Sequence, residues 1–271
     1  MTELMQGVVQ PEPEEIWCFP HRHVGRQVAV YSTLSSTNSL GAAWVARTEP
    51  SAWHGWAIVA REQTAGRGQK GRCWQAPAGK ALLLSVLVQP PPPVARPVIL
   101  TAWAAVAVAE AITAMTGLQA YIKWPNDLLL AHRKVCGILI ECHGSATVAG
   151  IGLNLTQQQQ DWSAAGLPTA ISLAQAADRL ITIAQAAQQV LYHLDIGYEH
   201  LIQGRHHLLL EEWRQRLGLL GRRVDVELSD GSRLTGQLHE VNFQTVVVST
   251  TAGLYRWPPE RIVHLYPTEQ A

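Results

Sequence analysis

The sequence has no excess of charge of either sign. Its 271 residues include 21 Lys+Arg and 21 Asp+Glu, so the formal net charge is +0. A neutral chain has no overall field that would attract nucleic acid or an anionic membrane, so any anionic ligand must meet local cations. A hydrophobic fraction of 47% is ample for a sizeable core. The composition therefore predicts a folded globular protein with one large domain or two unequal ones.

Cysteine is also scarce. The four cysteines lack C-x-x-C spacing and the density of a secreted disulfide scaffold. We interpret all four as free thiols, with Cys136 and Cys142 on the core-facing side of one strand. Histidines such as His21 and His23 lack supporting acidic or sulfur neighbours, so we expect no metal site built from protein ligands.

The sequence shows no secretory signal. Its first residues, MTELMQGVVQPEPEE, are acidic and interrupted by proline, without a basic start or an apolar run. Together with the free thiols, this predicts a cytoplasmic protein. The one long apolar run, 98–115, is interrupted by Thr101, Glu110 and Thr113, and predicts a buried helix rather than a membrane span.

Apolar runs and turn signals predict the order of the elements. Strands are expected at 26–34, 56–62, 81–90, 121–125, 128–131, 134–142 and 148–155, and helices after the SSTN segment at 35–38, at 98–115 and within 170–217. The turns at 126–134 and 143–147 are too short for parallel crossovers. The pattern predicts an α+β domain with a mostly antiparallel sheet.

The sequence pattern changes near Leu217. From there, short runs in which apolar and polar residues alternate are separated by turn signals. They predict a small β-barrel that forms its own domain. The expected organisation is a leader at 1–25, a catalytic domain at 26–217 and the barrel at 218–271.

A basic, glycine-rich loop with a tryptophan precedes the apolar strand at 81–90. Its glycines permit positive φ angles and a close approach to a ligand, and its cations favour an anion. These residues are Gly66, Gly68, Gly71, Arg67, Lys70 and Arg72. Trp74 is suited to cover an adenine or an apolar ligand body. Alone, such a loop is as well explained by an exposed basic turn, and it differs from Walker and dinucleotide loops, which precede a helix.

Three further segments accompany this loop: SSTN at 35–38, KWPNDLLL with RKVCGILIE within 123–141, and GIGLN at 150–154. In this order and approximate spacing, the chain resembles the biotin protein ligases over roughly residues 26–217. The resemblance implies the biotin/lipoate ligase fold, which is similar to class II aminoacyl-tRNA synthetases, followed by an SH3-like barrel.

The resemblance also implies a two-step reaction. Biotin and ATP, with Mg²⁺, form biotinyl-5′-AMP, and a lysine of a biotin carboxyl carrier domain of acetyl-CoA carboxylase then accepts the biotin. The residue types suit this chemistry independently, because fixed cations stabilise the charge that develops at the α-phosphorus. The candidate cations are Arg67, Arg72, Lys123 and Lys134.

Site residues follow from the matched motifs. The resemblance assigns catalysis to Lys134 and Arg67. It assigns biotin binding to Ser36, Thr37, Asn38, Gln63, Arg67, Gly68, Gln69, Lys134 and Gly137. It assigns nucleotide binding to Arg67, Arg72, Trp74, Lys123, Asn126, Asp127 and Asn154.

Several of these residues have a purely structural alternative. The SSTN segment is also explained as a helix cap, and Asn126-Asp127 as an ordinary β-turn. Gly137 is also explained as a strand glycine that is present for packing alone. The sequence departs from the family pattern at Ser35, Gln69 and Ala76, where an aspartate, an arginine and a serine are usual. These departures bear on affinity and loop dynamics.

Other activities stay open as alternatives: a lipoate-type protein ligase, a biotin-sensing regulator without ligase activity, or a noncatalytic binding module of the same fold. The stretch before residue 26 has no helix-turn-helix pattern, so we expect no specific DNA binding. Free sheet edges are compatible with a homodimer.

Overall fold

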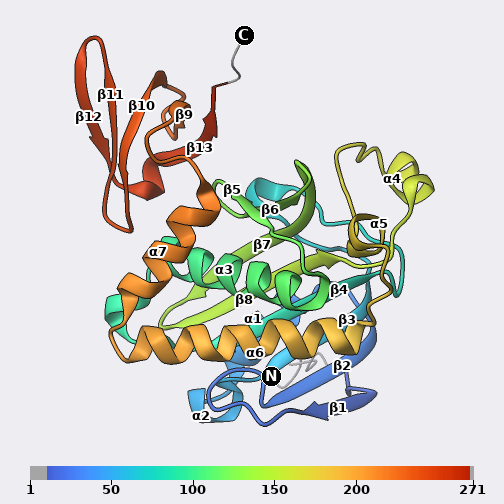
Figure 1. Ribbon diagram of the computed structural model, residues 1–271. Helices are drawn as coiled ribbons and strands as arrows, with labels where there is room; N and C mark the ends of the chain where they lie inside the picture. Colours follow the sequence, from blue (N-terminus) through green and yellow to red (C-terminus); the bar gives the residue numbers. More distant parts are fainter. Residues whose placement is uncertain (1–10, 269–271) are drawn as a thin grey trace, which may run out of the picture.

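A computed structural model describes residues 11–268, and its largest feature is an eight-stranded sheet (Figure 1). The strand order is β1-β2-β3-β4-β8-β7-β6-β5. The bounds are β1 Glu15–Cys18, β2 Gln27–Leu34, β3 Ala57–Gln63, β4 Ala81–Val88, β5 Tyr121–Lys123, β6 Asp127–Leu130, β7 Arg133–His143 and β8 Ala146–Asn154. Within this sheet only β2 and β3 pair in parallel. Helices between these two strands provide the crossover that a parallel pair needs. The predicted α+β class with a mostly antiparallel sheet is confirmed.

Both faces of the sheet are covered, because side chains alternate along each strand. On β2, Val28 and Val30 belong to the main core, whereas Ala29 and Tyr31 belong to a smaller core on the opposite face. All residues of β4 are buried for the same reason.

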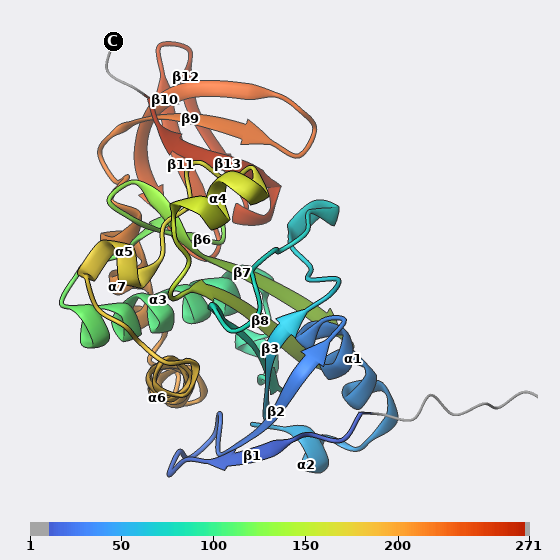
Figure 2. The ribbon, with the colours of Figure 1, turned by 90° about the vertical axis from the view of Figure 1, so that its right-hand side faces the viewer.

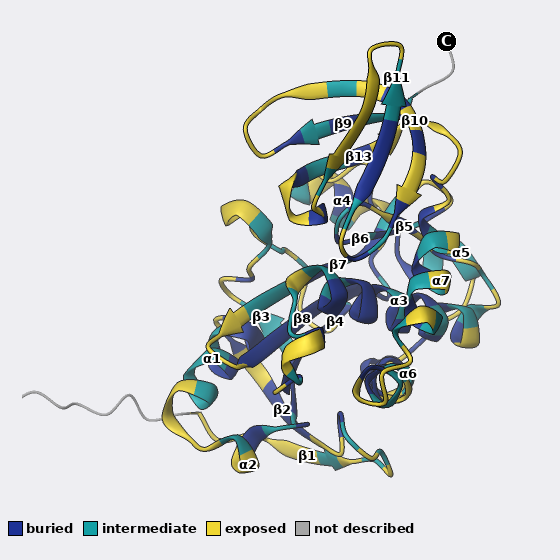
Figure 3. Cartoon of the chain, turned by 90° about the vertical axis from the view of Figure 1, so that its left-hand side faces the viewer, coloured by how far each residue is buried: buried dark blue, intermediate teal, exposed yellow. Residues whose placement is uncertain are grey.

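The main core lies beneath long helices: α3 Pro97–Thr116, α6 Ile183–Ile202 and α7 His206–Leu217 (Figures 1 and 3). Helix α3 is long and apolar enough to cross a membrane, but 72% of its apolar window is buried inside the protein. It packs between the sheet and α6, so it is a core helix, as the sequence predicts.

The opposite face carries α1 Thr37–Arg47, which packs on β3, β4 and β8. The shorter helices are α2 Pro50–Trp53, α4 Gln159–Ala165 and α5 Leu173–Ala177, with 3₁₀ turns at Gln69–Gly71, Pro92–Val94 and Pro259–Arg261. The face that carries α1 is also the face on which the candidate site lies.

The C-terminal part forms a separate antiparallel sheet of five strands in the order β12-β11-β10-β9-β13 (Figure 2). The bounds are β9 Arg223–Leu228, β10 Arg233–Val241, β11 Val246–Thr250, β12 Gly253–Trp257 and β13 Ile262–Pro267. Trp124 joins the two parts, because its indole Nε1–H donates to the Ile262 carbonyl of β13 at 3.0 Å. Its ring also lies 5.6 Å from that of Trp213 on α7, which in turn lies 5.3 Å from Phe243 between β10 and β11.

Some details differ from the sequence predictions. Strand β1 lies inside the stretch expected as a leader and pairs with β2, whereas residues 1–10 lie outside the described residues. All four cysteines are free, as predicted, but Cys142 is exposed because β7 runs past the edge of the core there. Cys136 is buried, and burial raises the pKa of its thiol.

Candidate functional site

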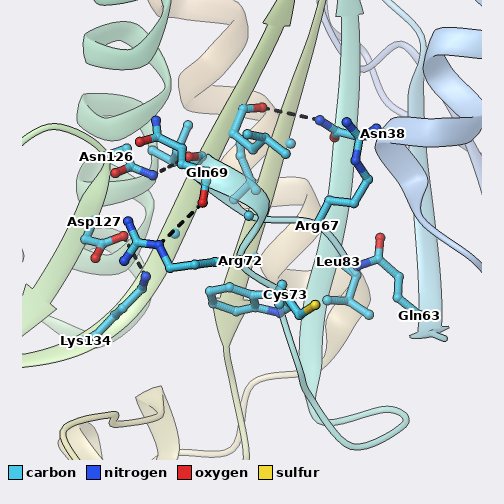
Figure 4. Close-up of a pocket in the computed structure, with 18 of the residues that line it drawn as sticks. Asn38, Gln63, Arg67, Gln69, Arg72, Cys73, Leu83, Asn126, Asp127 and Lys134 are labelled. Carbon is cyan, nitrogen blue, oxygen red and sulfur yellow. Dashed lines mark hydrogen bonds and ion pairs between the residues drawn. The ribbon is translucent and has the colours of Figure 1, made fainter. Parts of the chain in front are cut away.

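A cavity of about 480 Å³ opens on the α1 face of the large sheet (Figure 4). Its volume lies within the usual range for small-molecule sites, roughly 300–1,000 Å³. The cavity brings together nearly all the predicted site residues: Ser36, Thr37, Asn38, Gln63, Arg67, Gly68, Gln69, Arg72, Trp74, Lys123, Asn126, Asp127, Lys134 and Gly137. Asn154, which was also predicted, does not line it.

The polar triplet at the start of α1 is buried and preorganised. Ser36 occupies the N-cap position, but its side chain makes no capping hydrogen bond within the described part of the chain. The backbone N–H and the hydroxyl of Thr37 donate instead to Gln63 Oε1, at 2.8 and 3.0 Å. The helix-cap alternative therefore does not account for these side chains.

Ser85 completes this polar group, although the sequence analysis did not single it out. It is fully buried on β4, and its hydroxyl lies 2.6 Å from Asn38 Oδ1 and 2.7 Å from Thr37 Oγ1. Gly150 provides the room, because a Cβ there would lie 2.2 Å from Asn38 Oδ1. A polar residue within an otherwise apolar, buried strand was the signal available in the sequence.

The glycine loop, residues 64–74, folds back on itself above the sheet. Arg67 and Cys73 pair as an isolated bridge, and Gly68 N–H donates to Arg72 O at 2.7 Å. The three loop glycines permit positive φ angles, but one of the three uses this freedom. This is Gly71, at 73°, whereas Gly68 has an ordinary φ of −128° and Lys70 takes 55°. Gly66 is needed for space instead, since a Cβ would lie 2.3 Å from Trp74 O.

Trp74 lies flat against the sheet where Gly137 and Gly152 pair across β7 and β8. A Cβ on Gly152 would lie 2.4 Å from the indole, and one on Gly137 would lie 3.0 Å from it. In this structure the two glycines thus accommodate the tryptophan ring. The Trp74 Nε1–H is buried and has no hydrogen-bond partner among residues 11–268.

Lys134 projects into the cavity from an irregularity in β7. The β6–β7 register shifts where Leu128 pairs with Cys136 and Leu129 with Lys134. Such bulges re-aim side chains and are common beside active sites. The ammonium lies 2.7 Å from Asp127 Oδ1 and 5.8 Å from the centroid of the Trp74 ring.

The backbone of Lys134 is held from its other side by the segment that follows α4. Lys134 N–H donates to Thr169 O, and Ile171 N–H donates to Lys134 O, both at 2.9 Å. Asn154 is buried, and its amide donates to Ile171 O at 3.1 Å and to Lys134 O at 3.4 Å. Asn154 therefore lies behind the lysine rather than in the cavity.

The turn after β5 is fixed by a side-chain contact. Asn126 Nδ2 donates to Ile138 O at 2.7 Å, and Ile138 N–H donates to Asn126 O at 2.9 Å. The amide of Asn126 thus ties the turn to β7, while Lys123 and Asp127 on either side line the cavity.

Charged groups gather at two ends of the cavity. Figure 4 shows Arg67 beside Asn38 at one end, and Arg72, Asp127 and Lys134 together at the other. Arg67 forms an ion pair with Glu141, a residue of the RKVCGILIE segment that the sequence analysis left without a role.

A third ion pair lies just after the glycine loop in the chain. Lys80 Nζ lies 2.9 Å from the Asp161 carboxylate on α4. The pKa of Asp161 is lowered mainly by a hydrogen bond from the Gln158 backbone N–H and to a smaller extent by the hydrogen bond from Lys80. The paired charges connect α4 to the segment that leads into β4.

Comparisons with known proteins agree with this geometry. The family model described as the biotin/lipoate A/B protein ligase family matches residues 30–157. The biotin--[acetyl-CoA-carboxylase] ligase of Mycobacterium tuberculosis (strain ATCC 25618 / H37Rv) is 32% identical over 229 residues, which is 81% of each chain.

The bifunctional ligase/repressor BirA of Bacillus subtilis (strain 168) is 35% identical over 180 residues, which is 65% of this chain and 54% of that protein. The chain thus spans about half the length of that relative. Among solved structures, the biotin protein ligase of Aquifex aeolicus in complex with biotin and ATP aligns with a TM-score of 0.73 at 21% identity. That alignment covers 89% of this chain and 99% of the other and establishes a shared fold.

Proposed function

The chain belongs to the biotin/lipoate A/B protein ligase family, and we propose that it is an ATP-dependent biotin protein ligase. The observation that carries the proposal is that Arg67 of the glycine loop and Lys134 of β7 line one cavity together with the buried polar triplet. Cations from two separated segments and neutral hydrogen-bonding groups thus surround one space. That combination suits a ligand with a carboxylate at one end and a polar ring at the other.

Biotin occupies the side of the cavity beside α1 in this proposal. Thr37, Asn38 and Gln63 present polar atoms that are already fixed by one another and by Ser85. A polar group that is held before binding loses little conformational freedom when the ligand arrives. These residues are proposed to bind the ureido ring, with Ser36 beside them, and Gly68 and Gln69 to cover it.

The nucleotide occupies the side that carries Arg72, Trp74, Lys123, Asn126 and Asp127. A biotin carboxylate oxygen attacks the α-phosphorus, the bond to the leaving oxygen breaks, and pyrophosphate departs. Lys134 and Arg67 stabilise the added negative charge, an effect worth about 2.7–4 kcal/mol for one such donor. Trp74 offers its ring to the adenine.

Mg²⁺ is proposed to arrive with ATP. Protein sites usually hold this ion through one or two carboxylates together with substrate phosphates. Asp127 is the carboxylate among the residues that line the cavity, and the described residues contain no group of three or more His, Cys, Asp or Glu that could hold a metal.

In the second step, a lysine amine of a biotin carboxyl carrier domain, that of acetyl-CoA carboxylase, attacks the carbonyl of the mixed anhydride. The amide bond forms, the amine loses a proton, and AMP leaves.

We further propose a domain organisation in which residues 26–217 form the catalytic domain and residues 218–271 form an SH3-like barrel. We also propose that the protein acts in the cytoplasm and does not bind DNA specifically. A homodimer through a free sheet edge is compatible with this arrangement.

Pyrophosphate exchange into ATP tests the proposal. Exchange that depends on biotin and not on lipoate, followed by ATP-dependent transfer of labelled biotin to a carboxyl-carrier domain, is the expected result. Exchange with lipoate alone would assign the chain to lipoate-type ligases. Binding of biotin without exchange would make it a regulator or a binding module.

A further inference from the structure

Glu141 joins two parts of the candidate site through a single carboxylate. It lies near the end of β7, where its Oε2 accepts a hydrogen bond of 2.8 Å from the Asn38 amide. Its other oxygen, Oε1, pairs with the Arg67 guanidinium. The three residues come from α1, the glycine loop and β7. We call this contact the carboxylate bridge.

The position of Glu141 follows from strand alternation. Cys136 and Ile138 face the main core, so Gly137, Leu139 and Glu141 face the side that carries α1 and the cavity. The Glu141 side chain is 17% exposed and that of Arg67 is 47% exposed. The bridge thus connects a well-packed wall to a solvent-facing loop.

Two side chains attach the glycine loop to this face of the sheet, in addition to the backbone hydrogen bonds at the start of the loop. One is Trp74, which lies on Gly137 and Gly152. The other is Arg67, which also lies 3.5 Å from Ser39 Oγ through its second terminal nitrogen. Because Arg67 has five N–H donors, it can keep Glu141 while other donors face a ligand.

We infer that Glu141 is a positioning residue that holds the glycine loop closed over the biotin end of the cavity and fixes the orientation of the Asn38 amide. The consequence for ligand retention rests on the proposed function, whereas the consequence for the loop does not. A closed loop would keep water from a hydrolysable acyl adenylate.

The test uses Glu141→Gln, which keeps an oxygen for Asn38 but loses the charge that Arg67 needs. In ligand-free protein, trypsin cleavage after Lys70 and Arg72 should become about five- to tenfold faster, the range expected for loss of a partly exposed, charge-assisted hydrogen bond. Release of biotinyl-5′-AMP from the purified complex should accelerate by a similar factor, with kcat for adenylation changed much less.

Two further variants sharpen the test. Glu260→Gln removes the exposed Arg96–Glu260 ion pair, which involves no residue of the loop or of the carboxylate bridge, and should leave loop cleavage unchanged. Arg67→Gln should open the loop as Glu141→Gln does, and the double variant should be no more sensitive than either alone. Arg67→Gln alone also decides the matter if Glu141→Gln does not fold.

Unchanged trypsin cleavage in Glu141→Gln or in Arg67→Gln would overturn the inference. So would additive effects in the double variant. Failure of the wild-type protein to form any adenylate would instead count against the proposed function, because the proteolysis does not depend on it.

Discussion

Lys134 Nζ lies 2.7 Å from Asp127 Oδ1, across the hairpin that joins β6 and β7. The carboxylate holds the ammonium at the wall of the cavity, and the bulge in β7 directs the side chain there. A lysine that is oriented before the ligand arrives needs little rearrangement to meet a developing negative charge.

Replacing Lys134 should therefore impair chemistry rather than folding. Lys134→Ala should lower the rate of adenylate formation by about 100- to 1,000-fold, the usual loss for one preorganised donor. Its side chain is 37% exposed, so the circular dichroism spectrum should be retained. Pyrophosphate exchange measures the effect, and biotinylation of a carrier at the wild-type rate would refute the assigned role.

Ser85 should act on biotin affinity. Ser85→Ala leaves Asn38 Oδ1 and Thr37 Oγ1 without the hydroxyl they share, which costs about 1–3 kcal/mol for a buried group left unsatisfied. Calorimetry should give roughly tenfold weaker biotin binding. Ser163→Ala, at an exposed position on α4, is the matched control and should bind biotin normally. Equal affinity for the two variants would argue against preorganisation of the triplet.

Asn154 should affect the lysine rather than the nucleotide. Asn154→Ala removes the amide that bonds to the Lys134 and Ile171 carbonyls, so Lys134 is less well fixed. We expect kcat for adenylation to fall about tenfold, with KM for ATP nearly unchanged, because a lost hydrogen bond of this kind is worth about 1–3 kcal/mol. A rise in KM for ATP at unchanged kcat would instead support the direct contact between Asn154 and the nucleotide that the sequence predicts.

Trp124 should help to hold the turn that carries Lys123 and Asn126 in place, because it connects this turn to strand β13 of the C-terminal sheet. Trp124→Phe keeps a ring but leaves the Ile262 carbonyl without its donor, at a cost of about 1–3 kcal/mol in unfolding free energy. Urea denaturation measures this, and KM for ATP should rise. Trp257→Phe, which keeps the stack on Tyr255 in the edge strand β12, should change both quantities less.

Local patterns in the sequence were enough for most of the fold. Long apolar runs such as 81–90 and 98–115 predicted β4 and α3, because a strand or helix buried on all sides needs an unbroken apolar segment. The weaker elements were missed. Strand β1 has only four residues, and α4 lies in a polar stretch, so neither has a clear period. Whether the C-terminal strands close into an SH3-like barrel stays a prediction.

For the site, the sequence identified which residues gather but not how they are used. The family resemblance placed Lys134, Arg67 and the polar triplet together, and they do line one cavity. The roles of Ser85 and Glu141 depend on contacts between distant segments. A polar residue within an apolar strand marks Ser85 as unusual, but the sequence does not show what its hydroxyl contacts. Asn154 was predicted to contact the nucleotide because it belongs to a matched motif. Motif membership does not tell which way a side chain points, and Asn154 does not line the cavity.

The central claim is that Arg67 and Lys134 together bind the atoms that react. A crystal structure of the protein with biotinyl-5′-AMP tests it most directly. We predict the acyl phosphate within hydrogen-bonding distance of both side chains and the ureido ring beside Thr37 and Asn38. An adenylate bound elsewhere, or one that contacts neither cation, would contradict the account.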